Sequence, residues 1–376
     1  MSARRRSIAI LAIAVLLALA CWWLVDRRAV AGHAPAIVHA QGSSPAVADP
    51  GVARTSIRAS NIAAPDPDPD AAARQSDCTH DRRAQLQHRR EQLGTPGTPD
   101  AAIERALLTW LSGPELAPGE TARELMAASE RWPANVELAW LAAHHCPRTA
   151  CAAAWRHLAA LEPDNAAVWL MAMADTRRAH DQAGYEQALE RAGAARVYDP
   201  HDGLVFLHAR AVLAALPMPE RCRTPGQLAS LRQELGRTPT PDDWADLESV
   251  NTEAALGGAD HGGLQGCRAT AQPSGTRRQD CIALLSLVAS GRTLGDQALA
   301  LHMLLALEPD AAGTSQLRER YRRVRWLIRQ TRLARGIPPG ALIQQWTQGE
   351  VATLQARAIA EGRWPPPADW LPDDLR

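Results

Sequence analysis

The chain has 376 residues, of which 46% are apolar and only 4% aromatic, and its acidic and basic residues balance at 41 each. This neutrality gives no general attraction for nucleic acid, and the abundance of Ala, Leu, Arg, Glu and Gln favours helix over strand. The sequence contains no lysine, which excludes a phosphate-binding-loop lysine, a Schiff base to a pyridoxal cofactor and a Ser–Lys dyad.

The first predicted element is a membrane anchor within residues 1–31. Ile8–Val25 contains no charged residue and would span about 27 Å as a helix, close to the thickness of the hydrocarbon core. Arg4–Arg6 precede this run, and Trp22 and Trp23 lie near its far end. This charge and aromatic pattern predicts a cytoplasmic N-terminus and an exported body.

Two alternatives to the anchor remain open. Ala18–Cys21 resembles the signal that precedes a lipidated cysteine, so Cys21 is a candidate lipidation site of a lipoprotein. A cleaved signal peptide ending near Ala29–Ala31 is the other alternative. All three readings export the body. The use of arginine in place of lysine, together with 27 Pro and 12 Trp, is typical of a high-GC bacterial gene. The predicted location is therefore the inner membrane, crossed once, with the body in the periplasm.

Residues 32–76 are predicted to be a disordered linker. They are rich in Ala, Pro and Asp and have no hydrophobic period, so they cannot offset the entropy lost on ordering. Pro65–Asp70 repeats an Asp-x-Asp spacing, but it lacks the glycine and the closing glutamate of a calcium loop.

The body is predicted to be all-α, with short helices separated by Pro and Gly. It is divided into residues 77–216, residues 217–362, which could belong to the same domain, and a Pro-rich tail at 363–376. The pattern predicts helices at Asp100–Leu111, Glu120–Arg131, Ala134–His145, Ala150–Leu161, Ala166–His180, Gly184–Ala195, Gly203–Leu216, Gln227–Leu235, Asp242–Leu256, Arg278–Ala289, Leu294–Leu307, Ser315–Arg335, Pro338–Trp346 and Glu350–Glu361.

A short pattern occurs twice in these helices. Leu158–Asp164 and Leu304–Asp310 share L-x-A-L-E-P-D, and the first copy continues to Trp169. Residues 132–216 thereby resemble tetratricopeptide repeats, in which a proline closes one helical hairpin and an aromatic residue opens the next. The resemblance implies antiparallel hairpins stacked as a repeat-like, solenoid array with a concave protein-binding surface. The chain departs from the family pattern at Ala172, Met173, Thr176 and Ala188, and no ligand-binding residues carry over.

Six cysteines follow Cys21, an even number that indicates disulfides in an exported protein. Fifteen connectivities are possible for six cysteines. Closeness in sequence suggests two pairs and elimination leaves the third, giving Cys146–Cys151, Cys267–Cys281 and Cys78–Cys222.

Nitrogen and sulfur ligands gather at His144, His145, Cys146, Cys151 and His157. Zinc needs four ligands converging on a tetrahedron, and adjacent histidines on a helix point about 100° apart. A disulfide beside surface histidines is therefore the preferred interpretation, and no metal ligand, cofactor site or catalytic residue is assigned. An envelope enzyme or metal-binding protein with a His/Cys site in this region remains an alternative.

The helix predicted at Ser315–Arg335 is rich in arginine. It could present a basic face to an anionic lipid or an acidic partner, or it could be an ordinary solvated face. The residues of this candidate face are Arg318, Arg322, Arg325, Arg329 and Arg332.

These features together predict a membrane-tethered, extracytoplasmic helical scaffold that binds another protein or peptide of the cell envelope. The scaffold is expected to need no cofactor and to bind no nucleic acid, and the membrane is its other partner through the anchor. A purely structural subunit of an envelope complex is a further alternative.

Overall fold

The computed structural model describes residues 69–113, 118–146, 151–257, 261–268, 275–308, 313–333 and 336–375. The predicted anchor, Cys21 and most of the predicted linker lie outside these ranges. None of the helices within them combines the length and the low polarity that crossing a bilayer requires.

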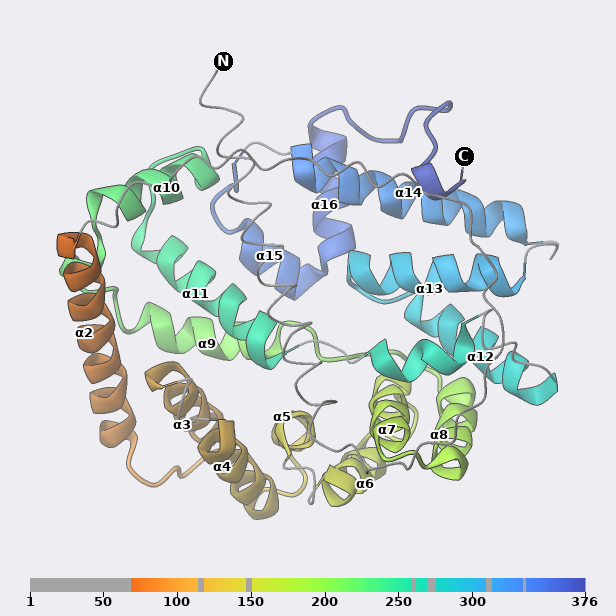
Figure 1. Cartoon of the computed structure of the whole chain (residues 1–376), viewed down its shortest axis with the longest axis horizontal. Helices are drawn as coiled ribbons and strands as arrows, with labels where there is room; N and C mark the ends of the chain where they lie inside the picture. Colours follow the sequence, from red (N-terminus) through yellow and green to blue (C-terminus); the bar gives the residue numbers. More distant parts are fainter. Residues whose placement is uncertain are drawn as a thin grey trace, which may run out of the picture. The chain divides into compact units, whose positions relative to one another are not determined.

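The described part of the chain is all-α, as predicted, and its one β-type pairing is an isolated bridge between Asn165 and Val197. The elements are labelled in Figure 1. Their bounds are α2 (Pro69–Leu93), α3 (Pro99–Ser112), α4 (Pro118–Arg131), α5 (Val136–His145), α6 (Cys151–Leu161), α7 (Ala166–Arg178), α8 (Gln182–Ala194), α9 (Leu204–Ala214), η1 (Glu220–Cys222), α10 (Pro225–Leu235), α11 (Pro241–Leu256), η2 (His261–Cys267), α12 (Gly275–Val288), α13 (Leu294–Leu307), α14 (Thr314–Leu333), α15 (Ala341–Gln348), α16 (Glu350–Ala360) and η4 (Asp373–Leu375).

Side-chain caps explain where many of these helices begin. The side chains of Thr98, Asn135 and Asp181 each accept a hydrogen bond from a backbone N–H in the first turn of α3, α5 and α8. Such caps satisfy donors that have no partner within the helix. The helix expected from Asp100 therefore begins one residue earlier, at Pro99, with Thr98 as its cap.

Helix α2 corrects the predicted linker boundary. Residues 69–76 were assigned to the linker but are helical, and the helix continues to Leu93, where none was expected. Its described part is polar on most sides, and only Cys78, Leu86 and Arg82 are buried there. A helix of this kind gives no clear 3.6-residue hydrophobic period and depends on tertiary contacts.

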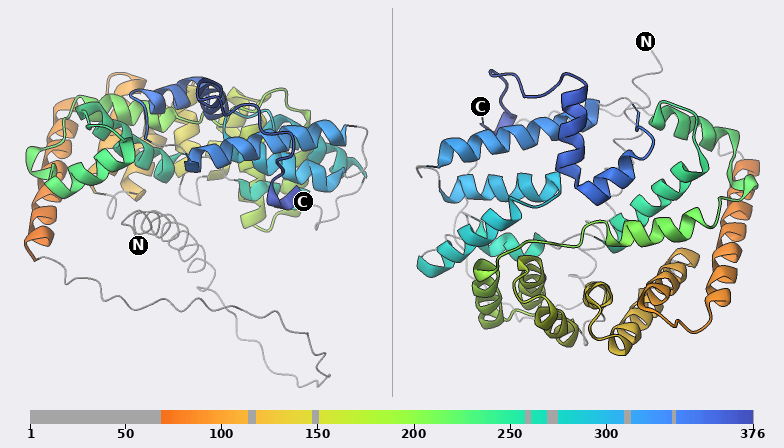
Figure 2. Two further views of the ribbon diagram at one scale, coloured as in Figure 1. Left: turned by 90° about the horizontal axis from the view of Figure 1, so that it is seen from above. Right: turned by 180° about the vertical axis from the view of Figure 1, so that it is seen from behind.

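Residues Pro65–Arg376 form one compact unit, which includes both helical regions and the Pro-rich tail. Chain neighbours pack together in the pairs α3–α4, α4–α5, α7–α8, α12–α13 and α13–α14. Longer-range pairs join α9 to α11, α9 to α3 and α8 to α12. Figures 1 and 2 show the successive helices of this unit following a curved path that brings α9 back beside α3, with α11 packed against α9.

Three hydrophobic clusters make up the core of this unit. The first cluster joins α7, α8, α12, α13 and α14, the second joins α3–α5 to α9, and the third joins α5, α6 and α7. Trp140 and Trp155 are buried in the third cluster, whereas Trp110, Trp132 and Trp169 are half-buried beside the cores. Close approach in the first cluster requires Gly193, because a Cβ there would lie 2.9 Å from the Asp280 Cα on α12.

The first copy of the repeated pattern joins two helix junctions. Asn165, which is buried, caps α7 by accepting from Ala167 N–H at 3.1 Å. The same side chain donates to the Asp199 carbonyl at 2.8 Å and accepts from the Asp199 N–H at 3.0 Å. The indole of Trp169 donates to the Pro163 carbonyl at 2.8 Å. The Asn165 side chain therefore links the turn between α6 and α7 to the connection between α8 and α9.

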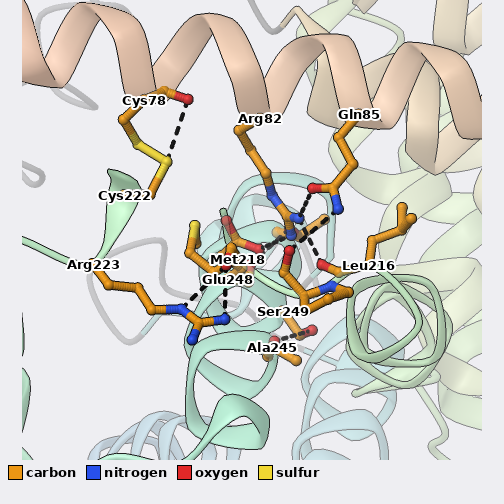
Figure 3. Close-up of polar contacts among 12 residues, drawn as sticks. Cys78, Arg82, Gln85, Leu216, Met218, Cys222, Arg223, Ala245, Glu248 and Ser249 are labelled. Carbon is orange, nitrogen blue, oxygen red and sulfur yellow. Dashed lines mark hydrogen bonds and ion pairs between the residues drawn. A yellow bond between two sulfur atoms is a disulfide. The ribbon is translucent and has the colours of Figure 1, made fainter. Parts of the chain in front are cut away.

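Helix α2 is held by a disulfide and by a buried arginine (Figure 3). Cys78 pairs with Cys222 of η1. The Arg82 guanidinium donates to the Leu216 carbonyl at 2.7 Å and to the Glu248 carboxylate at 2.5 Å. These contacts fix α2 to the end of α9 and to α11.

The C-terminal tail packs on α14. The Trp326 indole donates to the Arg363 carbonyl at 2.8 Å, and the rings of Trp326 and Trp370 lie 4.9 Å apart. The Tyr321 hydroxyl donates to the Asp374 carboxylate. The predicted Pro-rich tail is thus part of the folded unit.

Candidate functional site

A cavity of about 470 Å³ lies between α9, α11, η2, α13, α15 and α16. Pockets for small molecules commonly have volumes of this order. We call it the acid-lined cavity, because its charged lining residues are four carboxylates and two potential cations, Asp202, Glu253, Asp296, Glu350, His261 and Arg292.

Two of the four carboxylates cap helices that belong to other parts of the chain. Glu253 of α11 accepts hydrogen bonds from the backbone N–H groups of Gly203 at 3.2 Å and Phe206 at 2.7 Å, at the start of α9. Glu350 accepts from Leu294 N–H at 2.7 Å, at the start of α13. A carboxylate at a helix N-terminus satisfies free donors and meets the positive end of the helix dipole. Glu253 and Glu350 therefore have a structural role.

The two remaining carboxylates are less fully paired. Asp296 is 2% exposed, and its Oδ1 lies 2.6 Å from Nε2 of His261. Oδ2 of Asp296 and Oδ2 of Asp202 are buried and make no hydrogen bond with the described residues. These two oxygen atoms are free acceptors at the cavity.

Two buried donors beside the same cavity also lack a hydrogen-bond partner. They are the indole N–H of Trp346, which lines the cavity, and the hydroxyl of Tyr198, which does not line it but lies next to the Asp296 carboxylate. Buried polar atoms in folded proteins are nearly always satisfied by protein or by ordered water. A gathering of unsatisfied atoms around one cavity indicates a place where a polar ligand or water binds.

The backbone at Gly203, next to Asp202, allows Trp346 to pack closely against it. Gly203 has a φ of 87°, in the left-handed region, and a Cβ on it would lie 3.0 Å from Trp346 side-chain atoms. Glycine accepts both conditions at low cost. The Trp346 ring then packs against Phe206, with ring centroids 5.5 Å apart.

Three carboxyls at the cavity have a raised pKa. Burial, the largest cause, and the charges of Asp296, Glu253 and Asp199 together raise the pKa of Asp202 to about 7, while His261 opposes them. Burial also raises the pKa of Glu253 and of Glu350. The Tyr198 pKa lies well above its usual value because of burial and the nearby Asp296. An aspartate that titrates near neutral pH can either exchange protons in a reaction or respond to a bound charge.

The predicted His/Cys group takes a different form. The sulfur atoms of Cys146 and Cys151 lie 2.01 Å apart, at disulfide distance. Burial, and then the neighbouring His144, lower the pKa of His145 to about 4, so its ring is neutral. Across the described ranges, no three His, Cys, Asp or Glu side chains are grouped so that they could hold a metal ion.

The other two cysteine pairs suggested by the sequence also stand at disulfide distance. These are Cys78–Cys222 and Cys267–Cys281.

The arginines of the predicted basic face have different surroundings. Arg322 donates to Glu319 at 2.7 Å and to the Pro367 carbonyl of the tail at 2.7 Å. Arg325 is half-buried beside the Tyr321 ring, whereas Arg318 and Arg329 are exposed. The side chain of Arg332 lies outside the described residues.

A second cavity of about 420 Å³ lies beside the Cys78–Cys222 pair. Its lining includes Arg82, Met218 and Glu248, which Figure 3 shows close together. The charged groups of Arg82 and Glu248 are paired with each other. This cavity is therefore part of the α2 attachment.

Sequence reasoning assigned none of the acid-lined cavity residues to a site. Thr293–Asp296 has the spacing of a helix cap, and the Asp296 N–H does donate to Thr293 Oγ1 at 3.0 Å. The glycine-rich stretch that contains His261 lacks the G-x-G-x-x-G order of a dinucleotide-binding loop and matches no other ligand motif. The one available signal was an aspartate placed directly before a glycine and a helix, at Asp202.

Comparison with known proteins adds no relative: neither a family model, nor a curated protein, nor a solved structure matches the chain.

Proposed function

We propose that this chain is a membrane-tethered, extracytoplasmic helical scaffold whose acid-lined cavity receives a segment of a partner protein in the cell envelope. The apolar run Ile8–Val25 supports the tether. Three cysteine pairs at disulfide distance support an oxidising compartment. The pairwise packing of α3–α8 supports the tetratricopeptide-like arrangement of hairpins.

The observation that carries the binding role is the set of unsatisfied atoms around the cavity. Asp296 is almost fully buried and still has a free carboxylate oxygen there. A purely structural subunit has no need for such an atom, because leaving a buried polar group unpaired costs about 1–3 kcal/mol. A ligand that pairs with it recovers this cost.

The test is site-specific photo-crosslinking in living cells. Gln345 lines the cavity, whereas its neighbour Gln344 is exposed and is not among the lining residues. A benzophenone side chain placed at 345 should give a discrete adduct with an envelope protein. The same side chain at 344 is the matched control. Equal adducts from both positions, or none from 345, would count against a partner in the cavity.

A second candidate is an envelope enzyme that uses acid–base chemistry. It is favoured by the pKa of Asp202 near 7 and by the close pair of Asp296 and His261. Incubation with panels of chromogenic esters and glycosides would reveal it. An enzyme of this type should show a pH–rate limb near 7 that Asp202→Asn removes, and a lack of turnover on every substrate class would leave the scaffold as the better proposal.

A further inference from the structure

The unsatisfied acceptors of the acid-lined cavity are carboxylate oxygen atoms, whereas the unsatisfied donors near it, the Trp346 indole and the Tyr198 hydroxyl, are neutral. The N–H groups at the starts of α9 and α13, which could have attracted an anion, are already bonded to Glu253 and Glu350. The remaining free groups with negative character are Oδ2 of Asp202 and Oδ2 of Asp296. A ligand that satisfies them must donate hydrogen bonds, and a positive charge would strengthen each bond.

The charge balance of the cavity points the same way. Its four carboxyls face two cations at most, Arg292 and His261. Arg292 donates to the Thr347 carbonyl, and His261 lies against Asp296. Both cations are therefore engaged, and ionised carboxyls would be left without a counter-ion.

We propose that the acid-lined cavity binds an organic cation, an ammonium or guanidinium group that bridges Asp202 and Asp296. The inference deepens the proposed function, because a basic side chain is the part of a partner segment that would enter the cavity. A guanidinium carries up to five N–H donors in a planar fork that matches carboxylate oxygens.

Other features of the lining fit such an occupant. The Trp346 ring lies among the lining residues, and the face of a tryptophan attracts cations. Its free indole N–H needs an acceptor, which a peptide carbonyl next to a basic side chain can supply. A volume of about 470 Å³ has room for a whole side chain with its flanking atoms. The described residues offer no three-ligand group for a metal ion, which favours an organic cation over a metal cation.

Binding should be coupled to a proton. Asp202 is partly protonated near pH 7, and an arriving cation favours its charged form. Affinity should therefore rise roughly tenfold between pH 6 and pH 8. The groups that face Asp202 and enter this balance are Tyr198, Asp199, Glu253, His261, Arg292, Asp296 and Glu350.

The experiment is calorimetric titration of the full chain in mild detergent at pH 8. Butylguanidine is compared with butylurea, its neutral isostere, and acetyl-Gly-Arg-Gly-amide is compared with spermidine. Butylguanidine should bind at least tenfold more tightly than butylurea, because only the cation pairs with the carboxylates. Tighter binding of the peptide identifies a protein segment as the source, and tighter binding of spermidine identifies a free polyamine. Equal binding of butylguanidine and butylurea, or no binding of any probe at millimolar concentration, would overturn the proposal.

Variants locate the site. Asp296→Asn should lower the affinity for butylguanidine at least tenfold, and Asp202→Asn should also abolish its dependence on pH. Asp369→Asn is the control, because Asp369 is exposed and lies outside the cavity. Unchanged affinity in both cavity variants would place the cation elsewhere and contradict the proposal. If Asp296→Asn fails to fold, Asp202→Asn and the comparison of butylguanidine with butylurea still test whether a cation binds in the acid-lined cavity.

This test is separable from the cross-linking test of the proposed function. Cation binding without an adduct from position 345 would retain the cavity site and remove the protein partner. An adduct without cation binding would retain the partner and remove the cationic group.

Discussion

At the residue scale, the surroundings of Asp202 determine its pKa. It precedes α9 and is half-buried, and it faces other carboxylates. Burial and these neighbours raise its pKa to about 7. Glu253 differs from Asp202 because it caps α9, where a backbone N–H group donates a hydrogen bond to its carboxylate.

Asp202→Asn should change how stability depends on pH. Between about pH 4 and 7 the folded chain holds a proton on Asp202 that the unfolded chain has lost. The contribution of this group to the free energy of unfolding therefore falls as the pH rises through that window and levels off above it. Relative to the wild type, the variant should gain about 1–3 kcal/mol between pH 5 and pH 8. Urea denaturation at both pH values measures this, and a gain that does not grow with pH would contradict the assignment.

At the scale of elements, two sets of contacts join helices that are distant in the sequence. Asn165 links the start of α7 to the connection before α9, and Cys78 and Arg82 attach α2. Asn165 makes bonds to three backbone groups from a buried position. Asp181 performs only the simple capping role at α8, from an exposed position. The two positions offer a matched comparison.

Asn165→Ala should cost about 3 kcal/mol of stability, since it removes a cap and leaves buried backbone groups unpaired. Asp181→Ala, the control, should cost about 1 kcal/mol. Denaturant midpoints of the full chain give both values. Similar losses in the two variants would show that Asn165 acts only as a cap.

The three cysteine pairs should differ in their contribution to stability. The sequence separations are 144 for Cys78–Cys222, 14 for Cys267–Cys281 and 5 for Cys146–Cys151. Loop-closure entropy grows with loop length, so paired serine substitutions should cost about 5, 3 and 2 kcal/mol in that order. Hydrogen exchange should also show α2 losing protection only in Cys78→Ser/Cys222→Ser. A different order of the three losses would contradict the entropic argument.

At the scale of the whole molecule, the central expectation is export of the helical body. The three cysteine pairs lie in one compact unit that follows the predicted anchor. Reducing conditions in the cytosol would keep these thiols free. The state of the cysteines in cells therefore reports the compartment.

Protein isolated from its host under thiol-trapping conditions should resist maleimide–polyethylene glycol at the six cysteines after Cys21. Prior reduction should expose them and produce a stepwise shift on a gel. Protease added to spheroplasts should digest the body, with a cytoplasmic protein as the protected control. Labelling without reductant, together with protection from protease, would contradict an extracytoplasmic location.

The sequence by itself determined the helical class and the breaks at proline and glycine, because helix propensity and helix-breaking residues act within a few positions. It suggested the three cysteine pairs by closeness and elimination, but only the structure selected them from fifteen possible connectivities. Helix α2 was not predicted from the sequence, because it lacks a hydrophobic period and is held in place by the contacts of Cys78 and Arg82.

The acid-lined cavity is evident only from the tertiary structure. Asp202, Glu253, Asp296 and Glu350 come from separate parts of the chain, and each resembles an ordinary surface acid or cap when read locally. The raised pKa values of Asp202, Glu253 and Glu350 and the unpaired oxygen atoms of Asp202 and Asp296 arise from burial, which depends on how α9, α11, α13 and α16 are packed. Desolvation and charge–charge repulsion are properties of that three-dimensional neighbourhood, so no local pattern could have revealed them.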